Sequence, residues 1–308
     1  MNYYNRFKRI ISYLNYIFGI YLWVLIIYAF LRWTGLIKRV FMQEHLLGEY
    51  LSIPIKFGQK KPGVSKGSDE LYLSYFKEKF GGLNYEKKNF ELKYEEDDKN
   101  LLQLQQEISL TREKYFFSVF LGGDHSLAMG TISGMFLNCS NEKCVIWIDA
   151  HTDCNNLAES KTGNLHGTPV AGLLGDLEEP YDNYKCLDYS EICYIGTRNV
   201  DDYEKKYIEK HNILNMSMEM VNQDIDNVLA KLKKFVGNRE LHISFDVDVM
   251  DPELISSTGT PEVAGMKMEQ MKKIFDLLKQ FEIKSLDIVE FNPEIGNLEE
   301  SKNNLFTL

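Results

Sequence analysis

Short apolar runs that alternate with helical stretches place the strongest constraint on the fold of this chain. The runs are rich in β-branched and aromatic residues and cover Tyr50–Lys56, Tyr115–Leu121, Cys144–Ile148, Ile192–Ile195, Leu241–Phe245 and Ser285–Val289. Helical periodicity marks the longer stretches Asn100–Arg112, Leu127–Phe136, Met218–Phe235 and Lys267–Phe281. Strands that are apolar on both faces and spaced by helices form covered parallel sheets. The sequence therefore predicts an α/β fold with three layers, α/β/α, around a mostly parallel sheet, with the charged stretch 84–100 as a surface excursion around one edge strand.

The first 41 residues differ in composition from all that follow. Residues 10–31 carry no charge, and a helix of that length would span about 33 Å, the thickness of a bilayer core. The run is too long for the apolar part of a secretory signal, and three basic residues on each side leave its orientation open. Two interpretations stand side by side. Residues 10–31 form a transmembrane helix that anchors the protein in a membrane, or residues 1–41 are a non-native leader before a true start at Met42, and the domain 42–308 is cytoplasmic.

The charge of the chain is unevenly distributed. The net charge is −10, but residues 1–41 hold six basic and no acidic residues, so residues 42–308 carry a net −16. An acidic body repels phosphates and excludes nucleic acid as a partner, whereas it suits a small cationic substrate. The five cysteines form no CxxC pair, which argues against a disulfide framework and for a reducing compartment. Cys154 lies inside the richest motif, where we interpret it as a packing residue because no general base is tied to it.

Three polar motifs follow directly after predicted strands. They are Gly122–Ser126 (GGDHS), Asp149–Asn155 (DAHTDCN) and Ser244–Asp248 (SFDVD). Ligands of open parallel sheets bind beyond the carboxyl ends of the strands, so these motifs should converge at one edge of the sheet. An aspartate at the end of an apolar strand must be hydrogen-bonded, paired with a cation or bound to a metal.

The balance of charge in these motifs favours metal ions. Asp149, Asp153, Asp246 and Asp248 bring four negative charges, and no lysine or arginine lies within the motifs. Two divalent cations would balance these charges, and His125 and His151 would complete a shell of oxygen and nitrogen ligands that suits Mn²⁺ or a similar ion. The alternative is that the aspartates only cap loops and turns. Three such motifs with two histidines make that alternative the weaker one.

The motifs GGDHS, DAHTDCN, GNLHGTP and SFDVDVMDP, in this order, resemble those of the ureohydrolases, and most closely the arginases. The resemblance extends from about Tyr50 to Pro293, and residues 57–71 resemble the first loop of that family. It implies an arginase/deacetylase-like fold and a homo-oligomer, a trimer in the arginases. It also implies two Mn²⁺ ions bound by the six residues His125, Asp149, His151, Asp153, Asp246 and Asp248.

The resemblance also assigns the residues that would recognise the substrate. Asn155 and Thr162 match the groups that bind an α-carboxylate in arginases, while Asp201 and Glu204 match the acidic positions near the α-amino group. His166 matches a mobile histidine that shuttles protons, and Glu290, after the last predicted strand, matches the carboxylate that grips the guanidinium. Each has a simpler interpretation. His166 could be a loop histidine, Glu290 an ordinary strand-end acid, and the charged run that begins at Asp201 a solvated helix start.

The reaction that this resemblance implies is the hydrolysis of L-arginine to L-ornithine and urea by a hydroxide held between the two ions. Asp248 would accept the proton of the water, and His166 would protonate the departing amine. Two alternatives remain. One is an agmatinase or another ureohydrolase of guanidino compounds, and the other is a non-catalytic, membrane-tethered relative that only binds or assembles.

Two positions depart from the arginase pattern. Leu308 follows Glu290 by only 18 residues, whereas arginases continue through a further helix whose start we expect at Leu298–Phe306. Loss of the rest would expose apolar sheet surface and weaken a trimer. The second is Asn199, where arginases usually have an aspartate, and this exchange would loosen the α-amino contact near Asp201.

Overall fold

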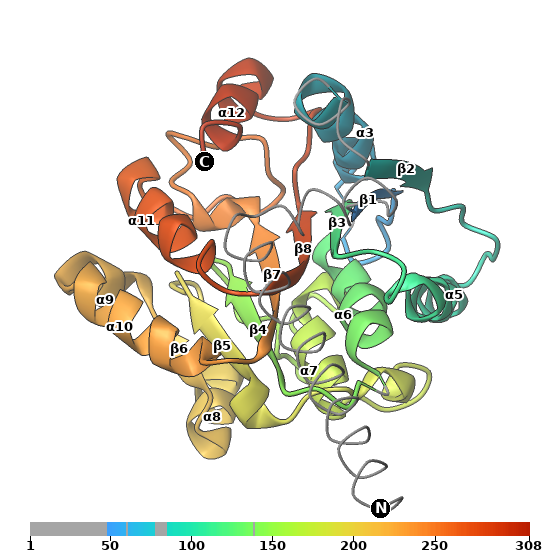
Figure 1. The fold of residues 1–308 in the computed structure, drawn as a ribbon, viewed down its shortest axis with the longest axis horizontal. Helices are drawn as coiled ribbons and strands as arrows, with labels where there is room; N and C mark the ends of the chain where they lie inside the picture. Colours follow the sequence, from blue (N-terminus) through green and yellow to red (C-terminus); the bar gives the residue numbers. More distant parts are fainter. Residues whose placement is uncertain (1–47, 60, 78–84, 138) are drawn as a thin grey trace, which may run out of the picture. The chain divides into compact units, whose positions relative to one another are not determined.

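A computed structural model describes residues 48–59, 61–77, 85–137 and 139–308 of the chain (Figure 1). These residues form one sheet of eight strands in the order β2-β1-β3-β8-β7-β4-β5-β6. The strands are β1 (Gly48–Ile53), β2 (Tyr85–Asn89), β3 (Phe117–Gly122), β4 (Lys143–Ile148), β5 (Ile192–Ile195), β6 (Leu214–Met216), β7 (Glu240–Asp246) and β8 (Ile283–Val289). All neighbouring pairs are parallel, which confirms the predicted sheet.

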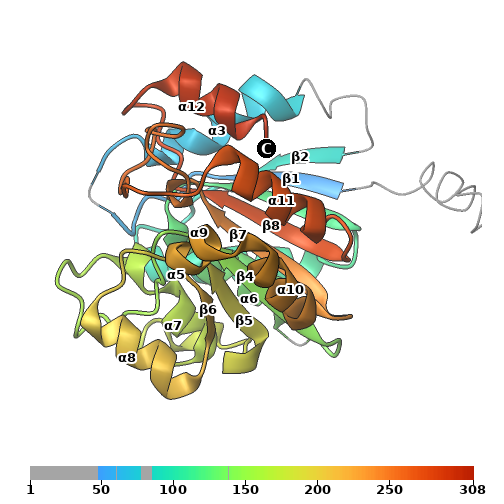
Figure 2. The ribbon, with the colours of Figure 1, turned by 90° about the vertical axis from the view of Figure 1, so that its left-hand side faces the viewer.

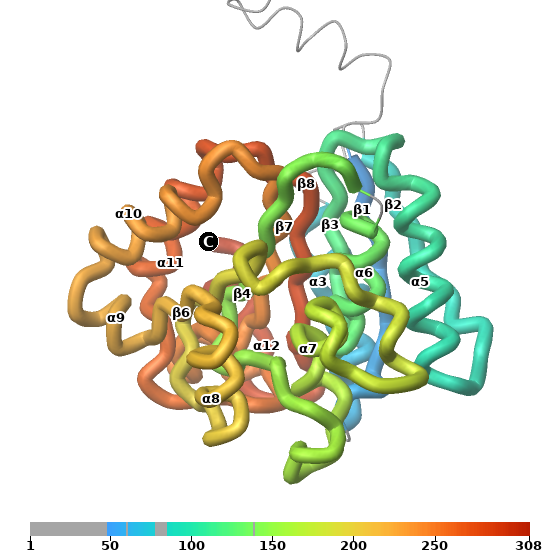
Figure 3. The backbone as a smooth tube through the Cα atoms, turned by 90° about the horizontal axis from the view of Figure 1, so that it is seen from below, coloured from blue at the N-terminus to red at the C-terminus, as the bar shows by residue number. Residues whose placement is uncertain are grey.

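Helices cover both faces of the sheet (Figure 3). The core on one face is built with α5 (Asp97–Thr111), α6 (Ala128–Phe136), α7 (Pro169–Leu174) and α8 (Asp202–His211). The core on the other face is built with α3 (Gly67–Leu71), α9 (Met218–Gln223), α10 (Ile225–Val236), α11 (Met268–Leu278) and α12 (Leu298–Leu305). The central strands are buried on both sides, because β4 alternates Val145 and Trp147 toward one core with Ile146 and Ile148 toward the other.

Most predicted elements form within a few residues of their expected bounds, and two predictions need correction. The stretch Met218–Phe235 is two helices, because Asp224 ends α9 and its side chain accepts a hydrogen bond from the Asn227 N–H at the start of α10. The short edge strand β6 was missed. The charged excursion does contain an edge strand, β2, whose side chains are half-buried or exposed.

The transmembrane prediction for residues 10–31 and the leader 1–41 lie outside the described residues. Among the residues that the structure describes, no helix is long and apolar enough to cross a membrane. The boundary at Met42 stays a prediction.

The expected last helix is present as α12, and an apolar groove lies beside it. The groove has a volume of about 330 Å³ and is lined by side chains of β7, β8, α11 and α12, among them Phe245, Leu286 and Phe275. The loss of further helical residues after Leu308 stays a prediction.

The parallel sheet places the carboxyl ends of its strands along one edge, on the left in Figure 2. Strand order matters for what meets there. β8 and β7 lie between β3 and β4, so the loops after these four strands are neighbours although their sequences are up to about 170 residues apart.

Candidate metal centre and active site

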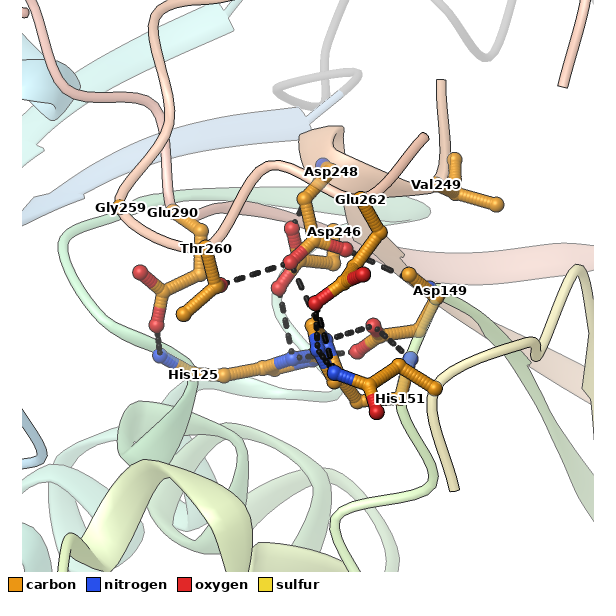
Figure 4. Close-up of polar contacts among 12 residues, drawn as sticks. His125, Asp149, His151, Asp246, Asp248, Val249, Gly259, Thr260, Glu262 and Glu290 are labelled. Carbon is orange, nitrogen blue, oxygen red and sulfur yellow. Dashed lines mark hydrogen bonds and ion pairs between the residues drawn. The ribbon is translucent and has the colours of Figure 1, made fainter. Parts of the chain in front are cut away.

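The three polar motifs meet at this edge of the sheet, as predicted (Figure 4). His125 follows β3 and starts a 3-10 turn, Asp149 follows β4, and Asp246 ends β7. All three are buried. The side chains of the two aspartates also hold the backbone that follows each of them. Asp149 accepts a hydrogen bond from the His151 N–H at 2.7 Å, and Asp246 accepts one from the Asp248 N–H at 2.8 Å.

His125 points its Nδ1 atom at three carboxylates. Nδ1 lies 3.0 Å from Asp149 Oδ2, 3.1 Å from Asp153 Oδ2 and 3.3 Å from Asp246 Oδ2. The other ring nitrogen, Nε2, is 2.8 Å from the Ser244 hydroxyl, and the ring stacks on the Trp147 indole at 4.0 Å. The Ser244 hydroxyl and the Trp147 indole therefore fix the orientation of the His125 ring, and Nδ1 points into the carboxylate cluster.

A second group forms around His151 and shares one member with the first. His151 Nδ1 lies 3.4 Å from Asp149 Oδ1 and 3.2 Å from Asp248 Oδ2. Asp149 thus faces one histidine with each of its carboxylate oxygens. The ligand atoms of His125, Asp149 and Asp153, and those of Asp149, His151 and Asp248, lie within 4.8 Å of one another, close enough for each group to hold a metal ion.

The electrostatics of this centre are those of a site with too much negative charge. Burial and the charges of Asp248 and Asp149 raise the pKa of Asp246 well above its usual value. Burial and the charge of Asp149 raise the pKa of Asp153 to about 6. Within the described residues, no lysine or arginine forms an ion pair with the four aspartates.

Both histidines respond to the same excess of acid. Burial alone would lower the pKa of His125, but its three carboxylate neighbours raise it well above the usual value. Burial also opposes the charged form of His151, whose pKa is raised by Asp248 and Asp149. The ionised form of Asp149 is the exception among the acids: burial disfavours it, yet the two imidazoles hold its pKa below the usual range. Oxygen and nitrogen ligands with a surplus of negative charge fit two divalent cations.

A cavity of about 250 Å³ opens beside Asp153 and Asp246, and the residues predicted to contact the substrate line its wall. Its lining includes Asn155, Thr162, His166, Asp201 and Glu204, together with the metal-ligand candidates His151, Asp153 and Asp246. The structure therefore gathers residues that are up to 109 positions apart in the sequence, from His151 to Thr260, around one cavity.

Asp201 and Glu204 both line the cavity and begin α8. Asp201 caps the helix and accepts hydrogen bonds from the Tyr203 and Glu204 N–H groups, and Glu204 accepts one from the Asp201 N–H. Asn155 Nδ2 donates to Asp201 Oδ2 at 2.8 Å. Burial raises the pKa of Glu204 to about 7. The helix-start interpretation and the cavity-wall interpretation thus describe the same two residues.

Glu290 and His166 form a pair on the other side of the centre. Glu290 is fully buried after β8 with a left-handed backbone, φ 62°, and its Oε1 accepts a hydrogen bond from the His125 N–H at 2.9 Å. His166 Nδ1 lies 3.1 Å from the same oxygen. Burial opposes the charged form of His166, but the hydrogen bond to Glu290 and nearby carboxylates raise its pKa to about 9.

The comparison with known proteins can now be set beside this geometry. The profile of the arginase family matches residues 50–305. Human mitochondrial arginase-2 is 32% identical over 279 residues, which cover 81% of this chain and 78% of that protein. The chain belongs to the arginase family.

Other relatives of this arginase-family chain agree. Bovine arginase-1 is 33% identical over 278 residues, covering 81% of this chain and 86% of that protein. The crystal structure of Entamoeba histolytica arginase in complex with L-ornithine superposes with a TM-score of 0.80 and 27% identity, covering 86% of this chain and 96% of that one. The chain is therefore an arginase-type ureohydrolase, and the non-catalytic alternative loses its support.

Sequence reasoning missed three residues of this arginase-type site because none of them lies in one of the four motifs. Gln59 is buried, and its side-chain amide donates to the Glu290 carboxylate. Thr260 donates to Asp248 Oδ2 at 2.9 Å. Glu262 lies beside His151 and Asn199. The signal for Gln59 was its place in the family's first loop, whereas nothing in the sequence marked the other two.

Cys154 agrees with the packing role predicted for it, and the histidines outside the motifs, which match no site of the family, lie away from the cavity where the structure describes them. Cys154 is fully buried, and burial raises the pKa of its thiol far above the usual value, which removes it as a nucleophile. His211 stacks on Tyr189 at the end of α8, and His242 is buried inside the sheet. His45 lies outside the described residues.

Proposed function

We propose that this arginase-family chain hydrolyses L-arginine to L-ornithine and urea with two Mn²⁺ ions. The observation that carries the proposal is one cavity whose lining combines three metal-ligand candidates, His151, Asp153 and Asp246, with the residues predicted to contact an amino acid. His125, Asp149, Asp153 and Asp246 would hold one ion, and Asp149, His151, Asp246 and Asp248 would hold the other. When bound, such a pair of ions lowers the pKa of a water molecule enough to supply hydroxide near neutral pH.

The residues of the chain would position and protonate the substrate around that centre. Glu290 offers a buried carboxylate to the guanidinium group, held in place by the His125 N–H and the amide of Gln59. Asp248 takes up the proton of the water, and the Thr260 hydroxyl orients its carboxylate. His166 is protonated at neutral pH and supplies a proton to the departing amine of ornithine.

The wall of the cavity supports an amino acid as the substrate. Asn155 and Thr162 would donate to the α-carboxylate, while Asp201 and Glu204 would face the α-ammonium group. Agmatine lacks the carboxylate and leaves the first pair of groups without a partner, which costs binding energy.

A substrate panel tests this proposal. We expect the manganese-loaded full chain to release urea from L-arginine at a kcat/KM at least about 100-fold higher than from agmatine, since a site built to hydrogen-bond a polar group rejects substrates that lack it. Preference for agmatine or another guanidino compound would replace arginine as the substrate, and no urea from any of them would overturn the proposal.

Thr162→Ala is the matched variant for the panel. Removing one hydrogen bond to a charged group costs about 1.5 kcal/mol, so KM for arginine should rise about tenfold, with little change for agmatine. Equal effects on both substrates would show that Thr162 does not contact the carboxylate.

The oligomer and the location stay predictions. A homo-oligomer, a trimer by resemblance, will be checked by light scattering of the purified chain. A cytoplasmic or membrane-anchored location will be checked by fractionation of cells that express residues 1–308 and 42–308.

A further inference from the structure

The second ring nitrogen of His151 faces a carboxylate that belongs to neither metal group. His151 Nε2 lies 3.6 Å from Oε1 of Glu262, in the segment between β7 and α11 (Figure 4). Among the described residues, Glu262 is the one acid within ion-pair distance of this nitrogen. Its side chain is 30% exposed, so it stands at the rim of the centre rather than inside it.

Glu262 is held in this place by two residues of the loop after β5. Asn199 Nδ2 donates to Glu262 Oε1 at 2.6 Å and lies 3.4 Å from His151 Nε2. Arg198 Nη2 donates to the main-chain oxygen of Glu262 at 2.7 Å and to that of Asp248 at 2.8 Å. The backbone N–H of Asn199 donates to the Ala150 carbonyl at 3.1 Å, which ties this loop to the residue before His151. Both the backbone and the carboxylate of Glu262 are thus fixed relative to the histidine.

The chemistry of a metal-binding imidazole explains why a carboxylate belongs there. Nδ1 of His151 points at Asp149 and Asp248, so a metal ion in that group would be bound by Nδ1 and the ring proton would sit on Nε2. A carboxylate that accepts this proton fixes the tautomer and the ring orientation, and raises the basicity of the ligand nitrogen. Asn199 does not take the role, because the atom that it brings near Nε2 is Nδ2, a donor, which donates to Glu262.

We propose that Glu262 is a positioning residue for the His151 metal site, and that Asn199 orients it. The inference rests on the proposed function only in taking the His151 group as a metal site, and its test measures metal binding instead of turnover.

The test compares Glu262→Gln with Glu253→Gln in the full chain. Glu253 is an exposed acid of the same segment and, among the described residues, forms no ion pair with the histidines of the centre, so it serves as the matched control. Metal-free protein is titrated with MnCl₂ by calorimetry. We expect two sites in the wild type, and in Glu262→Gln one site weakened about 10- to 100-fold with the other unchanged, because that is the usual effect of losing such a partner. Wild-type affinity at both sites of Glu262→Gln would overturn the inference.

A rescue separates positioning from a general effect on the loop. Asn199→Asp combined with Glu262→Gln puts the carboxylate back within reach of Nε2 from the other side, so the double variant should recover most of the lost affinity. Asn199→Asp alone sets two carboxylates against each other and should not bind metal better than the wild type. A double variant as weak as Glu262→Gln would overturn the positioning role. If the wild type binds two ions but releases no urea from arginine, the proposed function fails while this inference stands.

Discussion

Two buried histidine–aspartate clusters share strand β7, and they differ in one decisive respect. The first is the metal centre at the carboxyl end of the strand. The second lies in the middle of the sheet, where His242 Nε2 is 3.2 Å from Asp287 Oδ2 and His242 Nδ1 is 2.7 Å from the Ser285 hydroxyl. Thr131, on α6, donates to Asp287 Oδ2 at 2.9 Å.

The difference is the ratio of acids to bases and the access to them. The inner cluster has one acid for one histidine and hydroxyl partners for both, and its ionisable groups are fully buried. The metal centre has four aspartates for two histidines and opens into a cavity. Residue type therefore does not distinguish a metal-binding site from an internal histidine–aspartate pair. An excess of acidic over basic residues, together with a cavity that gives a ligand access, does distinguish them.

The largest effect is expected from the exchange Asp248→Asn in the metal centre. We expect urea release to fall about 1,000-fold or more, a loss of about 4 kcal/mol in transition-state stabilisation, since the group that accepts the proton is gone. Steady-state urea assays at saturating Mn²⁺ measure it, with circular dichroism to check the fold. Near-normal turnover would refute the proposed role of Asp248.

The same exchange in the inner cluster, Asp287→Asn, should give the opposite result. Removing one partner of a buried pair costs about 3 kcal/mol of folding free energy, because the other is left without compensation. Manganese stoichiometry and turnover of the folded protein should stay at the wild-type level. Urea denaturation followed by fluorescence measures the folding free energy. Calorimetric titration with MnCl₂ measures the manganese stoichiometry, and the urea-release assay measures turnover. A loss of bound manganese in Asp287→Asn would show that the two clusters are coupled.

Metal removal should have the smallest effect of the three changes, and the effect is on the stability of the folded state. At a free Mn²⁺ concentration 100-fold above the dissociation constant, one site adds about 2.7 kcal/mol to the stability of the folded state. Chelation should therefore lower the melting temperature of the wild type and of Asp287→Asn by similar amounts, as differential scanning calorimetry will show. An Asp287→Asn protein that is insensitive to chelation would contradict the separation of the two clusters.

The strands inside the sheet could be predicted from the sequence wherever an apolar run was long enough. Strand β5 has the predicted bounds Ile192–Ile195, because all four side chains are buried. Strand β6 escaped prediction because it is three residues long and half-buried at the sheet edge. The division between α9 and α10 had a signal in Asp224, a good N-cap residue, which the apolar periodicity on both sides concealed.

The site residues that belong to a motif could be predicted from the sequence. Those that reach the site from separate loops could not. His125, Asp149 and Asp246 follow strands whose order in the sheet makes them neighbours. Glu262 and Gln59 reach the same centre only because their loops fold back over it, and no local pattern records such a contact.

The left-handed backbone at Glu290 sets the stability of the fold against the function of its carboxylate. Glycine adopts this conformation without strain, whereas a glutamate held there carries a cost of order 1 kcal/mol or more. A glycine at this position would relieve the backbone strain, but it would discard the carboxylate that faces His166 and would leave the buried N–H of His125 without its acceptor. An engineer who wants a hardier enzyme should therefore leave residue 290 alone and strengthen the scaffold elsewhere.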